Sequence, residues 1–170
     1  MALIKKVNGL GPKIPESCFL AENATITGDV EMGENCSVWF SSVIRGDVCK
    51  IILGDKVNVQ DGAVLHGTYK KFDLTIGNNV SIGHNANVHG CTVHDNVLIG
   101  MGSTVMDNCV IHSNSIVAAG SVVLQNTVVE SGSIYAGVPA KKVKDIDPSQ
   151  FEELVKGIAD NYVMYSSWYE

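Results

Sequence analysis

The sequence predicts an all-β fold, a solenoid of short parallel strands, and three observations support it. Apolar residues recur every six residues from Ile14 to Tyr135, with breaks in spacing only after Ile44, Leu65 and Val88, and all 20 positions are apolar. Four residues after nearly every one, the side chain is small or β-branched. Three residues after the 20 apolar positions, 14 of the 20 residues are Asn, Asp or Gly, which favour tight corners. A β-sandwich would have a longer, drifting period.

This period resembles that of the hexapeptide-repeat proteins. The resemblance implies three hexapeptides per coil and a left-handed parallel β-helix of triangular section. We expect residues 1–140 to form it and residues 141–170 to form a C-terminal segment whose helix packs along one side. Asp147 before Pro148 is a good helix start. One apolar face then follows, formed by Phe151, Leu154, Val155, Ile158 and Tyr162.

Composition narrows the class of protein. Lys and Arg number 12 and Asp and Glu 18, a net charge of −6, and no basic cluster suits nucleic acid or an anionic membrane. No apolar stretch is long enough to span a bilayer. The five cysteines include no CxxC pair, so neither a disulfide framework nor a cysteine zinc site is indicated. We therefore expect a soluble, cytoplasmic protein.

Three histidines occupy positions that suit a metal ion. His66 and His89 each follow an apolar repeat position by one residue and stand three repeats apart, so they lie in one outward column on adjacent coils. His84 follows Ile82 by two residues, which puts it around a corner on the preceding face. A copy related by threefold symmetry could bring it to the same ion. Three imidazoles with an open fourth position are the ligand set of a catalytic zinc.

The alternative is that these are solvated turn histidines. His94 and His112 provide a comparison, because they too stack one coil apart. They have no third histidine and no carboxylate at adjoining positions, so we interpret them as surface residues.

Three segments, residues 44–47, 58–66 and 82–90, resemble the γ-class carbonic anhydrases and their bacterial relatives, and the likeness covers nearly the whole chain from about residue 10. It implies a homotrimer in which His66 and His89 bind zinc together with His84 of the next subunit. The reaction would be hydration of CO₂ to bicarbonate.

The same resemblance assigns further roles. It implies that Gln60 hydrogen-bonds the reactive hydroxide and that Asn58 lies close by. It places Arg45, Asp47 and Asp61 in a charged network between subunits, and the repeat positions agree, because the contact that brings His84 to its ion would bring Asp61 to Arg45.

The chain departs from active members at the proton route. Where they carry a glutamate after the position of Asp47, Val48 stands here, and the insertion at residues 67–73 has no glutamate in place of their acidic loop. Three functions stay open: a zinc hydro-lyase of weak activity, an acyltransferase using an acyl-CoA donor, and a non-catalytic trimeric subunit. Imidazole ligands would suit Zn²⁺, Fe²⁺ or Co²⁺.

Overall fold

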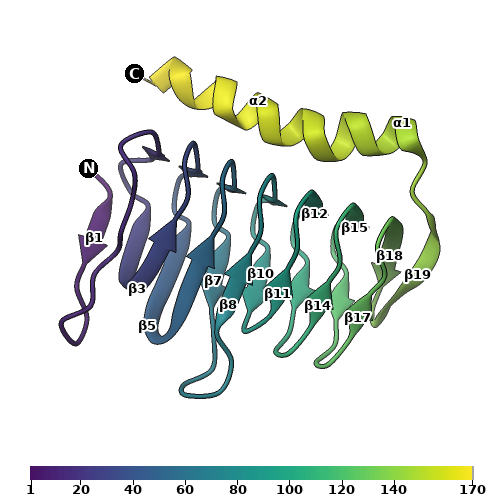
Figure 1. Ribbon diagram of the computed structural model, residues 1–170, viewed down its shortest axis with the longest axis horizontal. Helices are drawn as coiled ribbons and strands as arrows, with labels where there is room; N and C mark the ends of the chain where they lie inside the picture. Colours follow the sequence, from purple (N-terminus) through teal and green to yellow (C-terminus); the bar gives the residue numbers. More distant parts are fainter. Residues whose placement is uncertain (170) are drawn as a thin grey trace.

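The computed structural model describes residues 1–169, which form a three-sided rod of stacked coils with a helix lying along it (Figure 1). Regular coils hold 18 residues, as the pairs Val105↔Val123 and Ile99↔Val117 show. Three hexapeptides therefore make one coil, as the resemblance implied, and the strands within the coils pair in parallel.

The strands divide among three faces. The first face is built from β3 (Thr25–Met32), β5 (Val43–Leu53), β7 (Val64–His66), β10 (Asn87–His89), β13 (Thr104–Val105) and β16 (Val122–Val123). The long strands β3 and β5 bend at a register shift and continue onto the second face, with β8 (Leu74–Ile76), β11 (Thr92–Val93), β14 (Val110–Ile111) and β17 (Val128–Val129). The third holds β2 (Phe19–Leu20), β4 (Ser37–Val38), β6 (Asn58–Val59), β9 (Ser81–Ile82), β12 (Val97–Ile99), β15 (Ser115–Val117) and β18 (Ser133–Gly137).

The core follows the predicted period. Every apolar repeat position is buried except Ile14 and Leu20, which are half-buried near the open first coil. Corner residues adopt positive φ where the pattern places Asn or Gly, as in Asn35, Asn79, Asn85, Asn96, Asn108, Asn114 and Asn126. Asn23 and Asp29 share the corner position but do not adopt it. The period therefore fixes which side chain points inward along most of the rod.

Both ends of the rod carry a strand outside the six-residue pattern. At the N-terminus β1 (Leu3–Lys5) pairs in parallel with β3, and at the other end β19 (Ala140–Asp145) pairs antiparallel with β18. The sequence pattern did not indicate either strand. Each one covers the hydrogen-bonding edge of one face of its end coil, while β2, β16 and β17 remain edge strands.

The C-terminal helix begins as predicted. Asp147 accepts a hydrogen bond from the Ser149 backbone N–H at 2.8 Å, and Pro148 is the first helical residue. The helix comprises α1 (Pro148–Gln150), a π-helical segment η1 (Phe151–Lys156), α2 (Gly157–Ser166) and a final 3₁₀ turn η2 (Ser167–Tyr169). Val155 is buried, but Leu154 is exposed, contrary to expectation, because the wider π turn shifts the buried stripe.

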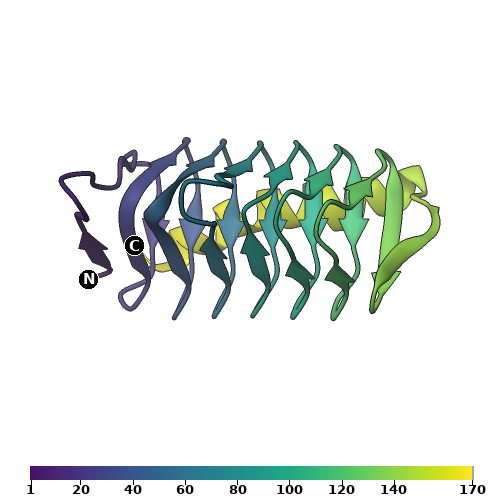
Figure 2. The ribbon, with the colours of Figure 1, turned by 90° about the horizontal axis from the view of Figure 1, so that it is seen from below.

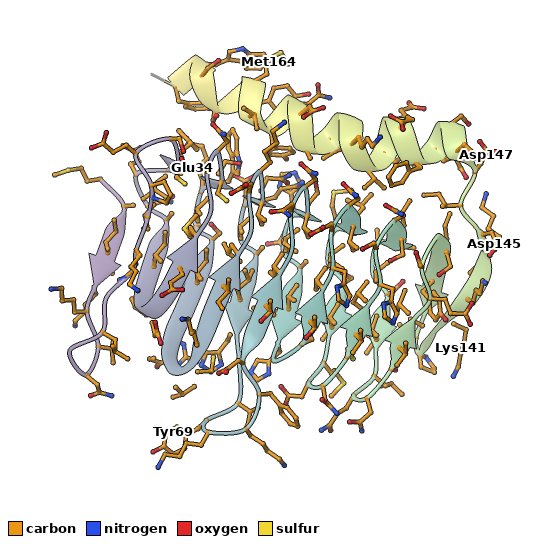
Figure 3. All side chains as sticks on the ribbon, viewed as in Figure 1. Glu34, Tyr69, Lys141, Asp145, Asp147 and Met164 are labelled. Carbon is orange, nitrogen blue, oxygen red and sulfur yellow. The ribbon has the colours of Figure 1, made fainter. Side chains whose placement is uncertain are left out.

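The helix lies over the third face and runs back toward the first coil (Figures 1 and 2). Lys56 pairs with Asp160 at 3.2 Å, and the Phe19 and Tyr169 rings meet with centroids 5.5 Å apart. Between β7 and β8 a loop protrudes from the rod, with Tyr69 at its tip (Figure 3). Among residues 1–169, no helix is long and apolar enough to cross a membrane.

Candidate metal centre

His66 and His89 meet where the repeat positions predict. They are register partners at the ends of β7 and β10, on adjacent coils of the first face. His66 Nδ1 lies 3.1 Å from His89 Nε2. The six-residue period, together with the three repeats per coil that the resemblance implies, therefore placed these two side chains together correctly.

Each imidazole turns its other nitrogen to a carboxylate. His66 Nε2 lies 3.1 Å from Asp47 Oδ1, and His89 Nδ1 lies 2.7 Å from Asp107 Oδ1. Because a carboxylate only accepts, each outer nitrogen carries the proton in the neutral ring. The four side chains form a file along the rod axis, which we call the carboxylate–histidine file: Asp47, His66, His89 and Asp107.

The file leaves the inner nitrogens of the two rings facing each other, with Arg45 Nη2 3.4 Å from His66 Nδ1. With both outer nitrogens protonated, His66 Nδ1 and His89 Nε2 each present a lone pair to the other, an arrangement that a cation between them would stabilise. Two nitrogens bound at about 2.0 Å in a tetrahedral site lie roughly 3.3 Å apart, close to the 3.1 Å observed here. Carboxylates behind metal-bound imidazoles are a usual support for such a site. The residues present thus fit two ligands of one ion.

A guanidinium stabilises one end of the file. Arg45 Nη1 pairs with Asp47 Oδ2 at 2.6 Å, and its Nη2 lies 3.4 Å from His66 Nδ1. Burial, and then the charge of Arg45, lower the pKa of His66. Burial acts to raise the pKa of Asp47, but hydrogen bonds from Arg45 and His66 outweigh it and the pKa is lowered. A neutral imidazole beside an ionised carboxylate is the state that metal binding requires.

His84 lies apart from the file, just after β9 on the third face. Its Nδ1 lies 2.8 Å from Asp61 Oδ2, and the Tyr162 hydroxyl lies 3.4 Å from its Nε2. Within residues 1–169 of a single chain, no three His, Cys, Asp or Glu side chains converge on one point. One chain therefore presents two separate parts of the candidate metal site: one part with His66 and His89, and the other, which we call the His84 half, with His84.

Gln60 and Asn58 belong to the His84 half. Gln60 Oε1 accepts from the His84 backbone N–H at 3.2 Å, and Gln60 Nε2 donates to Asn58 Oδ1 at 3.0 Å. Asn58 Nδ2 in turn donates to Ser81 Oγ at 2.8 Å. Both amides are buried, so this chain of hydrogen bonds fixes their orientation.

An apolar groove adjoins His84. It lies between the third face and the helix, has a volume of about 320 Å³ and is lined by Gln60, Leu98, Met101, Ile158 and Tyr165 among others. Tyr162 also borders it, and burial raises the pKa of its hydroxyl to about 12. The phenol is protonated at neutral pH, as an ordinary tyrosine also is, and its O–H can donate a hydrogen bond beside His84.

The charged residues expected between subunits have partners inside the chain. Arg45 pairs with Asp47, and Asp61 faces His84. The pairing of Arg45 with Asp61 of another copy stays a prediction. At the proton-route position, Val48 is half-buried on β5.

The comparison pair behaves differently from the metal candidates. The His94 and His112 rings stack face to face, with centroids 5.2 Å apart and an interplanar angle of 3°. In-plane lone pairs of parallel rings cannot point at each other. The His66 and His89 rings, in contrast, are inclined at 64°.

Sequence reasoning missed two neighbours of the histidines. Asp107 stands two residues after Val105, the register partner of Val88, so its repeat position one coil beyond His89 could have indicated it. Tyr162 was assigned only to the packed face of the helix, and the sequence holds no signal that places its hydroxyl beside His84.

Comparisons with known proteins give a consistent picture. The family model for bacterial transferase hexapeptide repeats matches residues 73–106 and 90–125. A carbonic anhydrase of Geobacillus kaustophilus is 43% identical, with the alignment covering 99% of this chain and 91% of that protein. A protein of Methanocaldococcus jannaschii named probable carbonic anhydrase is 49% identical over 89% of this chain and 92% of its own length.

Solved structures of the same size share the fold. A candidate acetyltransferase of Bacillus cereus is 37% identical with a TM-score of 0.95, covering 99% of this chain and 96% of that one. A hexapeptide transferase family protein of Anaplasma phagocytophilum is 39% identical with a TM-score of 0.94, covering 99% and 98%.

Proposed function

The chain belongs to the γ-carbonic anhydrase family of hexapeptide-repeat proteins. We therefore propose that it uses a divalent metal ion, with Zn²⁺ as the first candidate, to hydrate CO₂ to bicarbonate. The observation that carries the proposal is the carboxylate–histidine file, in which His66 Nδ1 and His89 Nε2 lie 3.1 Å apart and each ring has a carboxylate at its other nitrogen. A bound zinc ion would supply Lewis-acid chemistry that makes water a nucleophile near neutral pH.

The third ligand comes from another copy in this proposal. His84 lies on a different face from His66 and His89, so a homotrimer with the site between subunits would unite them. Asp61 supports the assignment, because it engages His84 Nδ1, so that Nε2 is the nitrogen that would turn to the ion in place of the Tyr162 hydroxyl, which lies 3.4 Å from it. Each of the three imidazoles would then have a carboxylate behind it.

Gln60 and Asn58 orient the reacting oxygen. The side-chain carbonyl of Gln60 accepts from the His84 backbone N–H, and one of its amide N–H groups donates to Asn58. The second amide N–H is left to donate. A buried amide held from both sides donates without reorganising, so it can hold water or bicarbonate in place. Proton release is the weak step, because Val48 and the loop at residues 67–73 offer no glutamate to carry the proton.

The test is metal content together with the CO₂ hydration rate, on protein prepared under reducing conditions. We expect about one ion per chain, and stopped-flow hydration that is lost on chelation and restored by zinc. His66→Ala and His94→Ala form a matched pair, because both remove a partly exposed imidazole, one from the file and one from the stacked pair. Full metal content in His66→Ala would refute the site.

A second candidate, acyl transfer, is favoured by the Bacillus cereus structure named as a candidate acetyltransferase. The groove beside His84 would have to hold the acyl-CoA donor, with His84 as the base. Acetyl-CoA turnover that survives complete removal of metal would support this function and exclude the first.

A further inference from the structure

We propose that Asp107 is the positioning residue of His89: it holds the imidazole in the Nδ1–H tautomer and aims Nε2 at the metal. The inference rests on the proposed metal site and adds a residue to it. It stands on the contacts of one carboxylate, whose oxygens both have a defined partner.

Asp107 is fixed at both oxygens. Oδ1 lies 2.7 Å from His89 Nδ1, and Oδ2 accepts from the Thr68 hydroxyl at 2.9 Å. Its side chain is 23% exposed, so solvent competes little for either contact. Thr68 belongs to the loop at residues 67–73, whose ends are joined by a bridge between Thr68 and Phe72. The protruding loop is thereby tied to the histidine through Asp107.

The rest of the rod shows what such a side chain does when no histidine is involved. At three glycines, a polar side chain from the next coil fills the space that a Cβ would occupy and accepts from the backbone N–H of the residue after the glycine. These are Gly33 with Asp55, Gly54 with Asn78 and Gly77 with Asp95.

Asp107 also fills the space beside a glycine, but the hydrogen-bond partner of its Oδ1 is the His89 ring and not a backbone N–H. It occupies the space beside Gly90. Because Val105 pairs with Val88, Asp107 stands opposite Gly90 itself. Because Val93 pairs with Ile76, Asp95 stands opposite the residue after Gly77, one position later. Its Oδ1 therefore reaches back to the His89 ring. A carboxylate in this position serves the imidazole, whereas its counterparts serve the backbone.

The consequence is that His89 Nε2 is held ready to bind the metal. A free imidazole distributes its proton over both nitrogens, and only the Nδ1–H form leaves Nε2 available for an ion. An acceptor at 2.7 Å selects that form before metal arrives. Loss of such a supporting carboxylate typically weakens metal binding 10–100-fold.

The experiment compares Asp107→Ala, Asp107→Asn and the matched control Asp95→Ala in the full-length chain. Zinc affinity is measured by competition with a chromophoric chelator, and the His89 tautomer by ¹⁵N NMR of the metal-free protein. We expect Asp107→Ala to lose about 10–100-fold in zinc affinity, and Asp107→Asn, which keeps an oxygen acceptor, to lose less. Asp95→Ala should lower the melting temperature and leave zinc affinity unchanged.

The outcomes separate the two claims. In metal-free parent protein His89 should be the Nδ1–H tautomer, and in Asp107→Ala it should shift toward Nε2–H. A folded Asp107→Ala with parental zinc affinity, or with an unchanged tautomer, would overturn the role of Asp107. A parent protein that binds no zinc while its His89 tautomer still depends on Asp107 would overturn the metal site and leave the positioning intact.

Discussion

Gly90→Ala should damage the metal site without touching a ligand. Gly90 has φ +47°, in the left-handed region that favours glycine. A Cβ there would overlap Asp107 Oδ1 and lie 2.8 Å from Phe72 Cβ. The Asp107 carboxylate is the softer of the two neighbours, since it can rotate away, and rotation takes it off His89.

The magnitude can be built from these two effects. The left-handed backbone costs an alanine about 1–2 kcal/mol, and crowding at a packed position adds about 1–3 kcal/mol. Gly90→Ala should therefore lower the free energy of unfolding by roughly 2–5 kcal/mol. Gly120→Ala is the matched control, because Gly120 has φ +67° and nothing within 4 Å of the added Cβ, so only the backbone cost applies.

Denaturant unfolding and chelator competition measure the two consequences separately. Zinc affinity of Gly90→Ala should fall about as far as that of Asp107→Ala, roughly 10–100-fold. The double variant should show no further loss, because both changes break the same contact. Gly120→Ala should keep parental affinity. Parental zinc affinity in Gly90→Ala, or additive losses in the double variant, would refute the reasoning.

Three further predictions follow from the site. His84→Ala should lose metal and weaken the trimer together, measured by metal analysis and sedimentation, and full occupancy would contradict a site split between copies. CO₂ hydration should be slow and should rise with imidazole buffer, since a proton shuttle contributes on the order of 10²–10⁴-fold; a fast, buffer-independent rate would point to another shuttle. Arg45→Ala should dissociate the trimer at micromolar concentration by removing the guanidinium from Asp61 of the next copy, which would keep only its His84 contact, and an intact, metallated trimer would show that the two residues do not meet.

Much of the fold and the positions of the histidines could be predicted from the period once the family resemblance supplied three repeats per coil. In a solenoid the repeat number fixes the coil and the offset fixes the direction of the side chain. His66 and His89 therefore had to be neighbours, and His84 had to lie around a corner. The core residues follow by the same argument, because a shift of one residue would turn every apolar side chain outward.

What the period could not predict depends on torsions and on the ends of the rod. The repeat position places Asp107 one coil beyond His89, but its carboxylate reaches the ring through side-chain rotation into the space beside Gly90, and a repeat pattern carries no information on rotamers. Strands β1 and β19 lack the period, and pairing with an open edge determines them. Leu154 was misplaced because the apolar-face argument assumes 3.6 residues per turn, while the helix widens to a π turn there.

Because the helix runs back along the rod, its length must match the length of the rod that it covers. Adding one coil would lengthen the rod by about 4.8 Å, which a helix matches with roughly three residues at 1.5 Å each. Tyr162 would otherwise slide away from His84, which it now approaches to 3.4 Å. Gain or loss of a coil between the histidines and the helix start is thus tolerated only with a compensating change in helix length. Rod length and helix length in this architecture should therefore evolve together.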